Sequence, residues 1–127
     1  MDMIRPVFQR PRTTAVPTIK TQIAVVNGAT SQLDIRPTSG QQWLVNFAKI
    51  YCVSFGGSSG NMVIYYVNGA DSITLARDAA PNTNDEISIA SFGNGPIVVT
   101  NANFVRIEVT STGGSSTFHL FGLAEEM

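Results

Sequence analysis

Short apolar runs with a period of two residues recur from Thr21 to Leu123, separated by clusters of Gly, Asn, Ser and Pro. Because side chains alternate between the two faces of a strand, these runs predict β-strands, and their even spacing is typical of a sandwich or barrel. Val and Ile, which favour strands, far outnumber Leu, so an all-helical protein is excluded. The expected strands are 21–26, 33–36, 43–53, 62–67, 71–76, 86–90, 97–100, 104–110 and 117–123.

The longest run, 43–53, is apolar on both faces, so we expect a central strand covered on both sides. In 104–110 the apolar residues alternate with polar and charged ones, which predicts a strand with one face in water. Tight turns are expected at 27–28 and 68–69, since Asn-Gly tolerates positive φ angles. The alternation assigns five side chains to the core: Trp43, Phe47, Val105, Ile107 and Phe118.

A set of short strands of this kind fits a double sheet better than an open one. The predicted fold class is therefore all-β, an antiparallel β-sandwich of the jelly-roll type, formed by residues 21–127 as a single domain.

Residues 1–20 have a different character and are predicted to form an extended arm. Pro6, Pro11 and Pro17 prevent a helix or a central strand from continuing. The arm is basic whereas the body is acidic, and it can reach roughly 65 Å when extended. Its apolar side chains exceed what a solvated tail needs, so we expect it to bind a partner. The predicted contact residues are Arg5, Val7, Phe8, Arg10, Arg12, Val16 and Ile19.

Composition narrows the classes of function. Only 13% of residues are charged, 43% are hydrophobic, and the net charge is −1, which argues against a nucleic-acid partner for the domain. No apolar stretch is long enough to cross a membrane, and the first twenty residues lack a signal-peptide core. Cys52 is the single cysteine, so no intrachain disulfide can form and this small domain is expected to gain its stability from packing or from neighbouring subunits. We predict that the domain associates with itself.

Candidate catalytic groups are sparse. His119 is the single histidine and lies in a strand-like run, and Cys52 has no basic neighbour that would activate it, so neither predicts nucleophilic catalysis. The acidic residues between Asp78 and Glu86 fit a solvated loop better than a paired-carboxylate or calcium site. We therefore predict no enzyme activity and no cofactor or metal.

Four aromatic residues offer an alternative function. Trp43, Tyr51, Tyr65 and Tyr66 would suit sugar stacking if they formed one platform, although aromatics at strand spacing are usually core residues.

Two segments, QQWLVNFAKIY (41–51) and PIVVTNANFVRIEV (96–109), together with the proline-spaced basic arm, resemble the small β-sandwich virion proteins of tailed bacteriophages. The resemblance covers about residues 41–123 and assigns no role to a particular residue. Cement or decoration proteins of this kind often form trimers over the symmetry axes of a capsid and bridge shell subunits with extended termini. The resemblance thus implies a structural protein that associates with itself as a homotrimer.

The predicted function is a non-enzymatic phage head cement or decoration protein. It would be made in the host cytoplasm, sit on the capsid surface of the virion, and bind itself and the major capsid protein or another virion protein. Two alternatives remain: a carbohydrate- or receptor-binding virion module, and a shell-forming coat protein whose arm contacts the genome. The genome-binding arm would normally carry more cations than this one.

Overall fold

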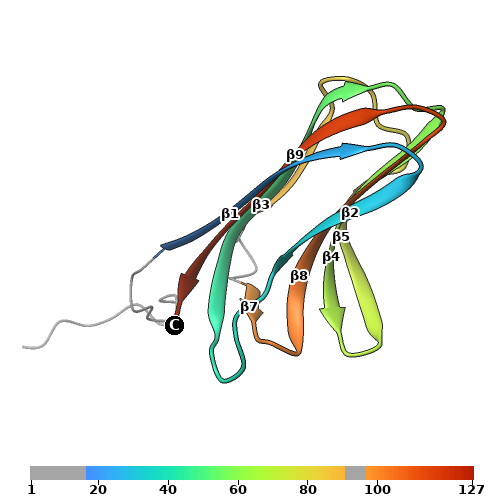
Figure 1. Cartoon of the computed structure of the whole chain (residues 1–127). Coiled ribbons are helices and arrows are strands. Elements are labelled where there is room, and N and C mark those ends of the chain that lie inside the picture. Colours follow the sequence, from blue (N-terminus) through green and yellow to red (C-terminus); the bar gives the residue numbers. More distant parts are fainter. Residues whose placement is uncertain (1–16, 91–96) are drawn as a thin grey trace, which may run out of the picture.

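A computed structural model describes residues 17–90 and 97–127, and these residues form nine strands and no helix (Figure 1). The A sheet has the strand order β1-β9-β3-β6, with β7 also paired to β3, and the B sheet has the order β2-β8-β4-β5. All pairings are antiparallel. The strands are β1 (Pro17–Val26), β2 (Ala29–Ile35), β3 (Trp43–Phe55), β4 (Ser59–Asn68), β5 (Asp71–Asp78), β6 (Glu86–Ala90), β7 (Ile97–Val99), β8 (Asn103–Thr112) and β9 (Ser116–Glu126).

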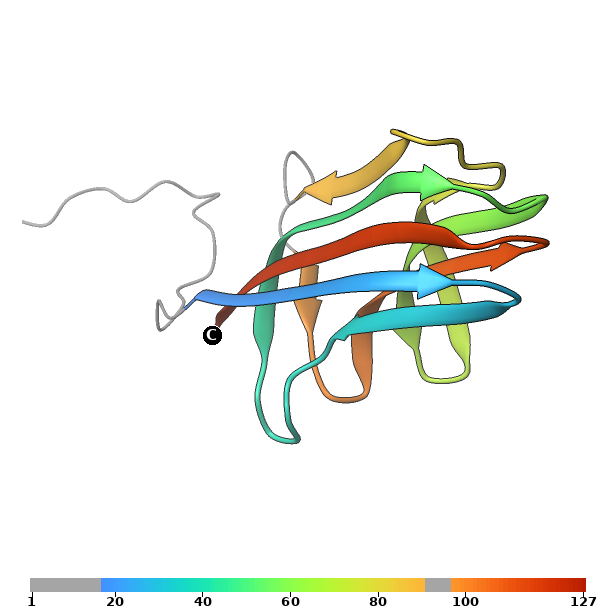
Figure 2. The ribbon, with the colours of Figure 1, turned by 45° about the horizontal axis from the view of Figure 1, so that its top comes forward.

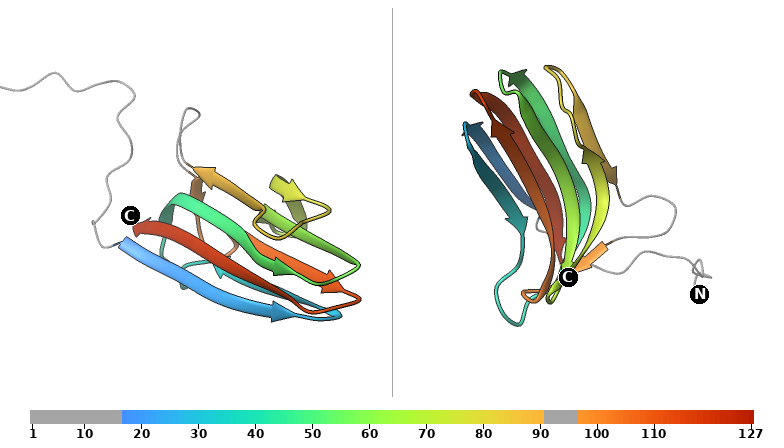
Figure 3. Two further views of the ribbon diagram at one scale, coloured as in Figure 1. Left: turned by 90° about the horizontal axis from the view of Figure 1, so that it is seen from above. Right: turned by 90° about the vertical axis from the view of Figure 1, so that its right-hand side faces the viewer.

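The two sheets face each other in the strand order of a jelly roll. Strands β1, β3, β6 and β9 of the A sheet each join a B-sheet strand, namely β2, β4, β5 and β8, at one end of the sandwich (Figure 2). Strands β1 and β2 therefore lie at one edge, and β6 and β5 lie at the other (Figure 3). The predicted all-β sandwich is confirmed.

Two Gly-Gly-Ser-Ser loops pack against each other at the end where the chain crosses between the sheets. A Cβ atom on Gly56 would lie 2.5 Å from the carbonyl oxygen of Ser115, and one on Gly114 would lie 1.9 Å from that of Gly56. The hydroxyls of buried Ser111 and Ser116 are 2.8 Å apart and hydrogen-bonded. Glycine is required here because the backbones approach too closely for a side chain.

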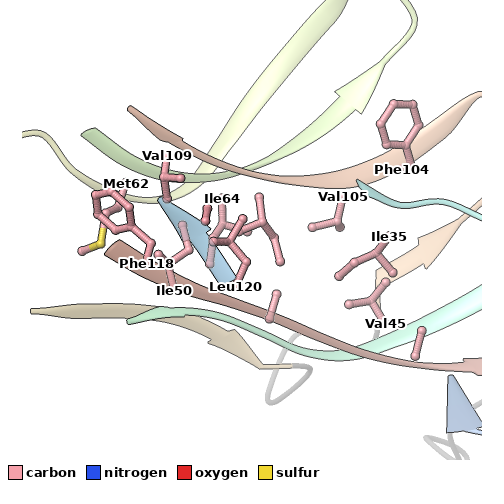
Figure 4. Packing of buried hydrophobic residues seen from close by; sticks show 14 of the residues in the cluster. Ile35, Val45, Ile50, Met62, Ile64, Phe104, Val105, Val109, Phe118 and Leu120 are labelled. Atoms are coloured by element: carbon pink, nitrogen blue, oxygen red, sulfur yellow. The ribbon is translucent and has the colours of Figure 1, made fainter. Parts of the chain in front are cut away.

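The core lies between the sheets, where inward side chains of both sheets interdigitate (Figure 4). Val105, Ile107 and Phe118 are fully buried, as predicted. The assignment of Phe47 to the core is wrong, because a register shift between Val45 and Phe47 reverses the alternation of β3. Beyond that bulge the buried residues are Ala48, Ile50 and Cys52. Trp43 is half-buried at the margin of the core.

Strand β3 is central in its sheet, but beyond the bulge no second layer of the described residues covers its outward side. Its outward residues Phe47 and Tyr51 are half-buried, and Val53 is exposed. The second apolar face, which suggested a covered strand, is instead part of an outer surface of the sandwich.

Strand β1 begins four residues earlier than predicted, at Pro17, so residues 17–20 pair with β9 rather than belong to an arm. Proline is tolerated there because it is the first residue of an edge strand. The turn at Asn68-Gly69 forms the predicted hairpin, with Gly69 at φ 63°. The turn at Asn27-Gly28, with Gly28 at φ 65°, connects the two sheets.

Candidate interaction surfaces

The outward side chains of β1, β9 and β3 form a largely apolar surface, here called the A face. Cross-strand pairing places Ile19, Leu123 and Phe47 in one row, and Ile23, His119 and Tyr51 in another. The A-face residues on β1 are the most exposed large hydrophobics of the described chain: Ile19 at 61%, Ile23 at 69% and Val25 at 69%.

Polar groups of the A face lie mainly toward β6. The Lys49 ammonium is 2.9 Å from a carboxylate oxygen of Glu86, and the Tyr51 hydroxyl donates to Asn84 Oδ1 at 2.6 Å. The rings of Phe47 and Phe121 meet edge to face, with centroids 5.9 Å apart. The A face thus passes from aliphatic at β1 to mixed aromatic and charged at β3.

The outer surface of the B sheet, here called the B face, has the opposite character. Arg106 donates two hydrogen bonds to Asp34, at 2.7 and 3.0 Å, and Thr30 and Thr110 are hydrogen-bonded across β2 and β8. Hydrogen bonding to Asp34 raises the pKa of Arg106. The Tyr65 hydroxyl donates to Glu108. These satisfied polar pairs suit a surface that stays in water.

A second apolar surface lies at the β5 and β7 side of the molecule. Five residues line a shallow hollow there, called the edge hollow: Tyr66, Ile73, Leu75, Ile97 and Val98. Ile73 is 56% exposed, whereas Tyr66 and Ile97 pack against the core below. Alternation along the sequence does not reveal this surface or the exposed positions of Ile23 and Val25.

The proposed sugar platform does not form. Tyr51 lies on the A face, and Tyr65 contacts Glu108 on the B face. Tyr66 and Trp43 pack at different margins of the core, and the Lys20 ammonium lies 5.8 Å from the Trp43 ring centroid. The aromatics that would stack on a sugar are therefore dispersed over the molecule.

The two candidate nucleophilic groups, His119 and Cys52, are not placed as a nucleophile and its base would be. His119 is exposed on the A face, and Cys52 is fully buried. Burial raises the pKa of the Cys52 thiol, and the negative charges of Asp85 and Asp78 add to the effect. A buried thiol that holds its proton is a poor nucleophile.

Two aspartates of the acidic loop before β6 accept hydrogen bonds from backbone amides of the same loop. Asp78 accepts a hydrogen bond from the Ala80 amide at 3.0 Å, and Asp85 accepts one from the Asn82 amide at 2.9 Å. Within residues 17–90 and 97–127 no three His, Cys, Asp or Glu side chains are grouped to hold a metal ion. The same part of the chain has no helix that would span a membrane.

Among the predicted arm contacts, only Ile19 is part of the described structure. It lies on β1 opposite Leu123 and is among the exposed aliphatics of the A face. The six others lie outside the described residues: Arg5, Val7, Phe8, Arg10, Arg12 and Val16.

Comparison with known proteins finds a similar fold among solved structures but no related sequence family. No family model matches the chain, and no curated protein shows significant similarity. Among solved structures, a chain from the study "Bacillus endospore appendages form a novel family of disulfide-linked pili" is 11% identical, with a TM-score of 0.56 over 98% of both chains. At this identity the similarity shows a shared fold alone.

Two other solved structures are less similar to this chain. A mitogen derived from Yersinia pseudotuberculosis is 8% identical, with a TM-score of 0.43 over 84% of this chain and 86% of the mitogen. A chain of infectious bursal disease virus strain Gx is 11% identical, with a TM-score of 0.39 over 98% of this chain and 36% of its own length.

Proposed function

We propose that the protein is a non-enzymatic structural component of a virus particle, a phage head cement or decoration protein that binds the shell as a homotrimer. The observation that carries this proposal is the contrast between the two outer surfaces of the sandwich. The A face exposes Ile19, Ile23 and Val25 to water, while the B face pairs its charges and hydroxyls internally. Contiguous exposed apolar surface on a small domain marks an interaction site.

The A face would be turned toward the particle or neighbouring copies and the B face toward solvent. Residues 1–16 would add a second attachment, through Val7 and Phe8 as apolar anchors and through three arginines. The anchors contribute the larger share, since burial of one such side chain is worth up to about 1.5–3 kcal/mol before ordering costs. The charges add a smaller contribution that salt weakens.

Assembly would be non-covalent. The structurally similar appendage protein is described as part of a disulfide-linked pilus. In this chain the single cysteine, Cys52, is fully buried beneath the A face and is out of reach of another subunit. Self-association must therefore use surface side chains.

The test is labelling of intact particles. Antibodies raised against the folded domain are applied to particles purified from the virus or prophage that encodes the chain, and electron microscopy locates the label. The proposal predicts regularly repeated label on the head surface. Label at the tail tips alone would favour the receptor-binding alternative, and unlabelled particles would refute a virion role. Label that requires opened heads would favour a coat protein with an internal arm.

A further inference from the structure

The two apolar surfaces of this molecule lie on opposite sides of the sandwich and differ in shape. One is the aliphatic stripe Ile19, Ile23 and Val25 on β1, here called the β1 stripe, which projects from an edge strand. The other is the edge hollow beside β5, which is the edge strand of the B sheet on the far side (Figure 3). An isologous contact through either surface would leave the other in water.

A head-to-tail contact covers both surfaces at once. We propose that the β1 stripe of one copy packs into the edge hollow of the next copy, and that the repeated contact closes a ring. This inference rests on the proposed function for the number of copies in the ring, which is three. A head-to-tail contact generates a closed ring when its rotation closes, and a trimer is the smallest such ring that needs two unlike surfaces.

Shape and charge support this pairing of surfaces. Ile23 and Val25 are two residues apart on one side of a strand, about 7 Å, and form a ridge that would fill the recess lined by Tyr66 and Ile73 of the next copy. The outward residues of β1 around the stripe, Ile19, Thr21, Ile23 and Val25, carry no charge, and neither do the five residues that line the edge hollow. A contact between the two surfaces would therefore bury no unpaired charge.

The contact is through side chains rather than a shared β-ladder. Within the described residues β1 pairs with β9 alone, so its other edge has free backbone groups. The Lys20 side chain nevertheless lies on the inner side of this edge strand, half-buried and directed toward the Trp43 ring. A charge in that position opposes edge-to-edge strand pairing.

The test uses two variants of the full chain that each damage one surface. Ile23→Glu places a charge on the β1 stripe, and Ile73→Glu places one in the edge hollow. Each variant should weaken self-association at least about tenfold, as measured by analytical ultracentrifugation. Thr74→Glu is the matched control, because Thr74 is exposed on β5 but points to the other side of the strand from Ile73. It should assemble like the parent.

Mixing the two variants distinguishes the head-to-tail contact from other contacts. Ile23→Glu retains an intact hollow and Ile73→Glu retains an intact stripe, so an equimolar mixture should form a one-to-one dimer that neither variant forms alone. The inference is overturned if the mixture stays monomeric, if Ile73→Glu assembles normally, or if the parent chain is a monomer. The milder pair Val25→Gln and Leu75→Gln repeats the test should a glutamate variant fail to fold. Particle labelling is a separate readout, so the cement proposal can survive the loss of this inference.

Discussion

Phe118 and Phe47 both occur in alternating apolar runs, yet only one of them fills the core. Phe118 is fully buried between the sheets, while Phe47 contacts Phe121 on the A face. The difference comes from the bulge between Val45 and Phe47, which sequence periodicity does not reveal because one extra residue reverses every side chain that follows it.

The different positions of Phe118 and Phe47 predict that truncating them lowers the free energy of unfolding by unequal amounts. Phe118→Ala should lower the free energy of unfolding by about 3–5 kcal/mol through loss of burial and the cavity left behind. Phe47→Ala should cost about 1 kcal/mol or less in the isolated chain, since its side chain is already partly in water. Urea unfolding of both variants measures this. Equal losses would show that the A face is covered within a single molecule.

Cys52 should be inert while the chain is folded. Its side chain is fully buried, and burial raises the pKa of the thiol, so little thiolate is available. A disulfide reagent should therefore react at least about a thousandfold more slowly with the native protein than with the urea-unfolded chain, because reaction requires opening of the core. Rapid labelling without unfolding would contradict the burial of this residue.

Tyr65 should make the folded state sensitive to alkaline pH. Burial raises the pKa of its phenol, and the acceptor Glu108 adds to this, while Arg106 acts in the opposite direction. Because the folded state holds this proton more tightly than the unfolded chain does, the stabilisation is complete below the unfolded value of about 10 and falls as pH rises past it.

Unfolding free energies measured between about pH 9 and pH 11 should therefore fall more steeply for the parent than for Tyr65→Phe. Tyr66→Phe serves as the control for loss of a tyrosine hydroxyl elsewhere on β4. Parallel curves for the parent and Tyr65→Phe would contradict a raised pKa at this position.

At the scale of elements, every strand expected from periodicity is present, and the errors concern where strands begin and end. Pro17 and Lys20 interrupt the strand pattern at the start of β1, so the sequence predicts an arm there. An edge strand nevertheless tolerates both residues. Strand β2 begins at Ala29 because the short polar side chains of Thr30 and Ser31 pair with β8 as well as apolar ones would. Such pairing depends on which strand is the partner, and the local sequence does not reveal this.

Removal of residues 1–16, to give a chain that begins at Pro17, should separate folding from attachment to the particle. The nine strands of the described residues make up the sandwich without residues 1–16, so this shortened protein should show the same melting behaviour as the parent. It should bind its particle more weakly, and the loss should persist at high salt, since apolar anchors outweigh screened charges. Quantitative sedimentation with particles measures the binding.

A full-length variant with Arg5, Arg10 and Arg12 replaced by glutamine is the matched comparison. It should lose less affinity than the shortened chain. If both lose the same affinity and the difference from the parent disappears at high salt, the arginines were the contact and a phosphate-bearing partner is the better account. If the shortened chain binds as well as the parent, the folded domain alone is responsible for attachment.

At the scale of the whole molecule, the contrast between the two outer surfaces arises from topology. Asp34 and Arg106, or Ile19 and Leu123, are far apart in sequence and become neighbours only when β2 pairs with β8 and β1 with β9. Periodicity shows that both faces of a strand are apolar, as in β3, but it does not show whether a second layer covers the outer one. The alternative of a sugar-binding groove is disfavoured for the same reason, because the tyrosines fall on different surfaces.

The central proposal is that this β-sandwich is a trimeric cement protein with its A face covered and its B face in water. A cryo-electron microscopy reconstruction of particles carrying the chain tests it most directly. The account predicts three jelly rolls around a symmetry axis of the head, with Ile19, Ile23 and Val25 in contact with protein and the Asp34–Arg106 pair exposed to solvent. Density for single, unassociated domains, or domains whose A face points outward into solvent, would contradict it.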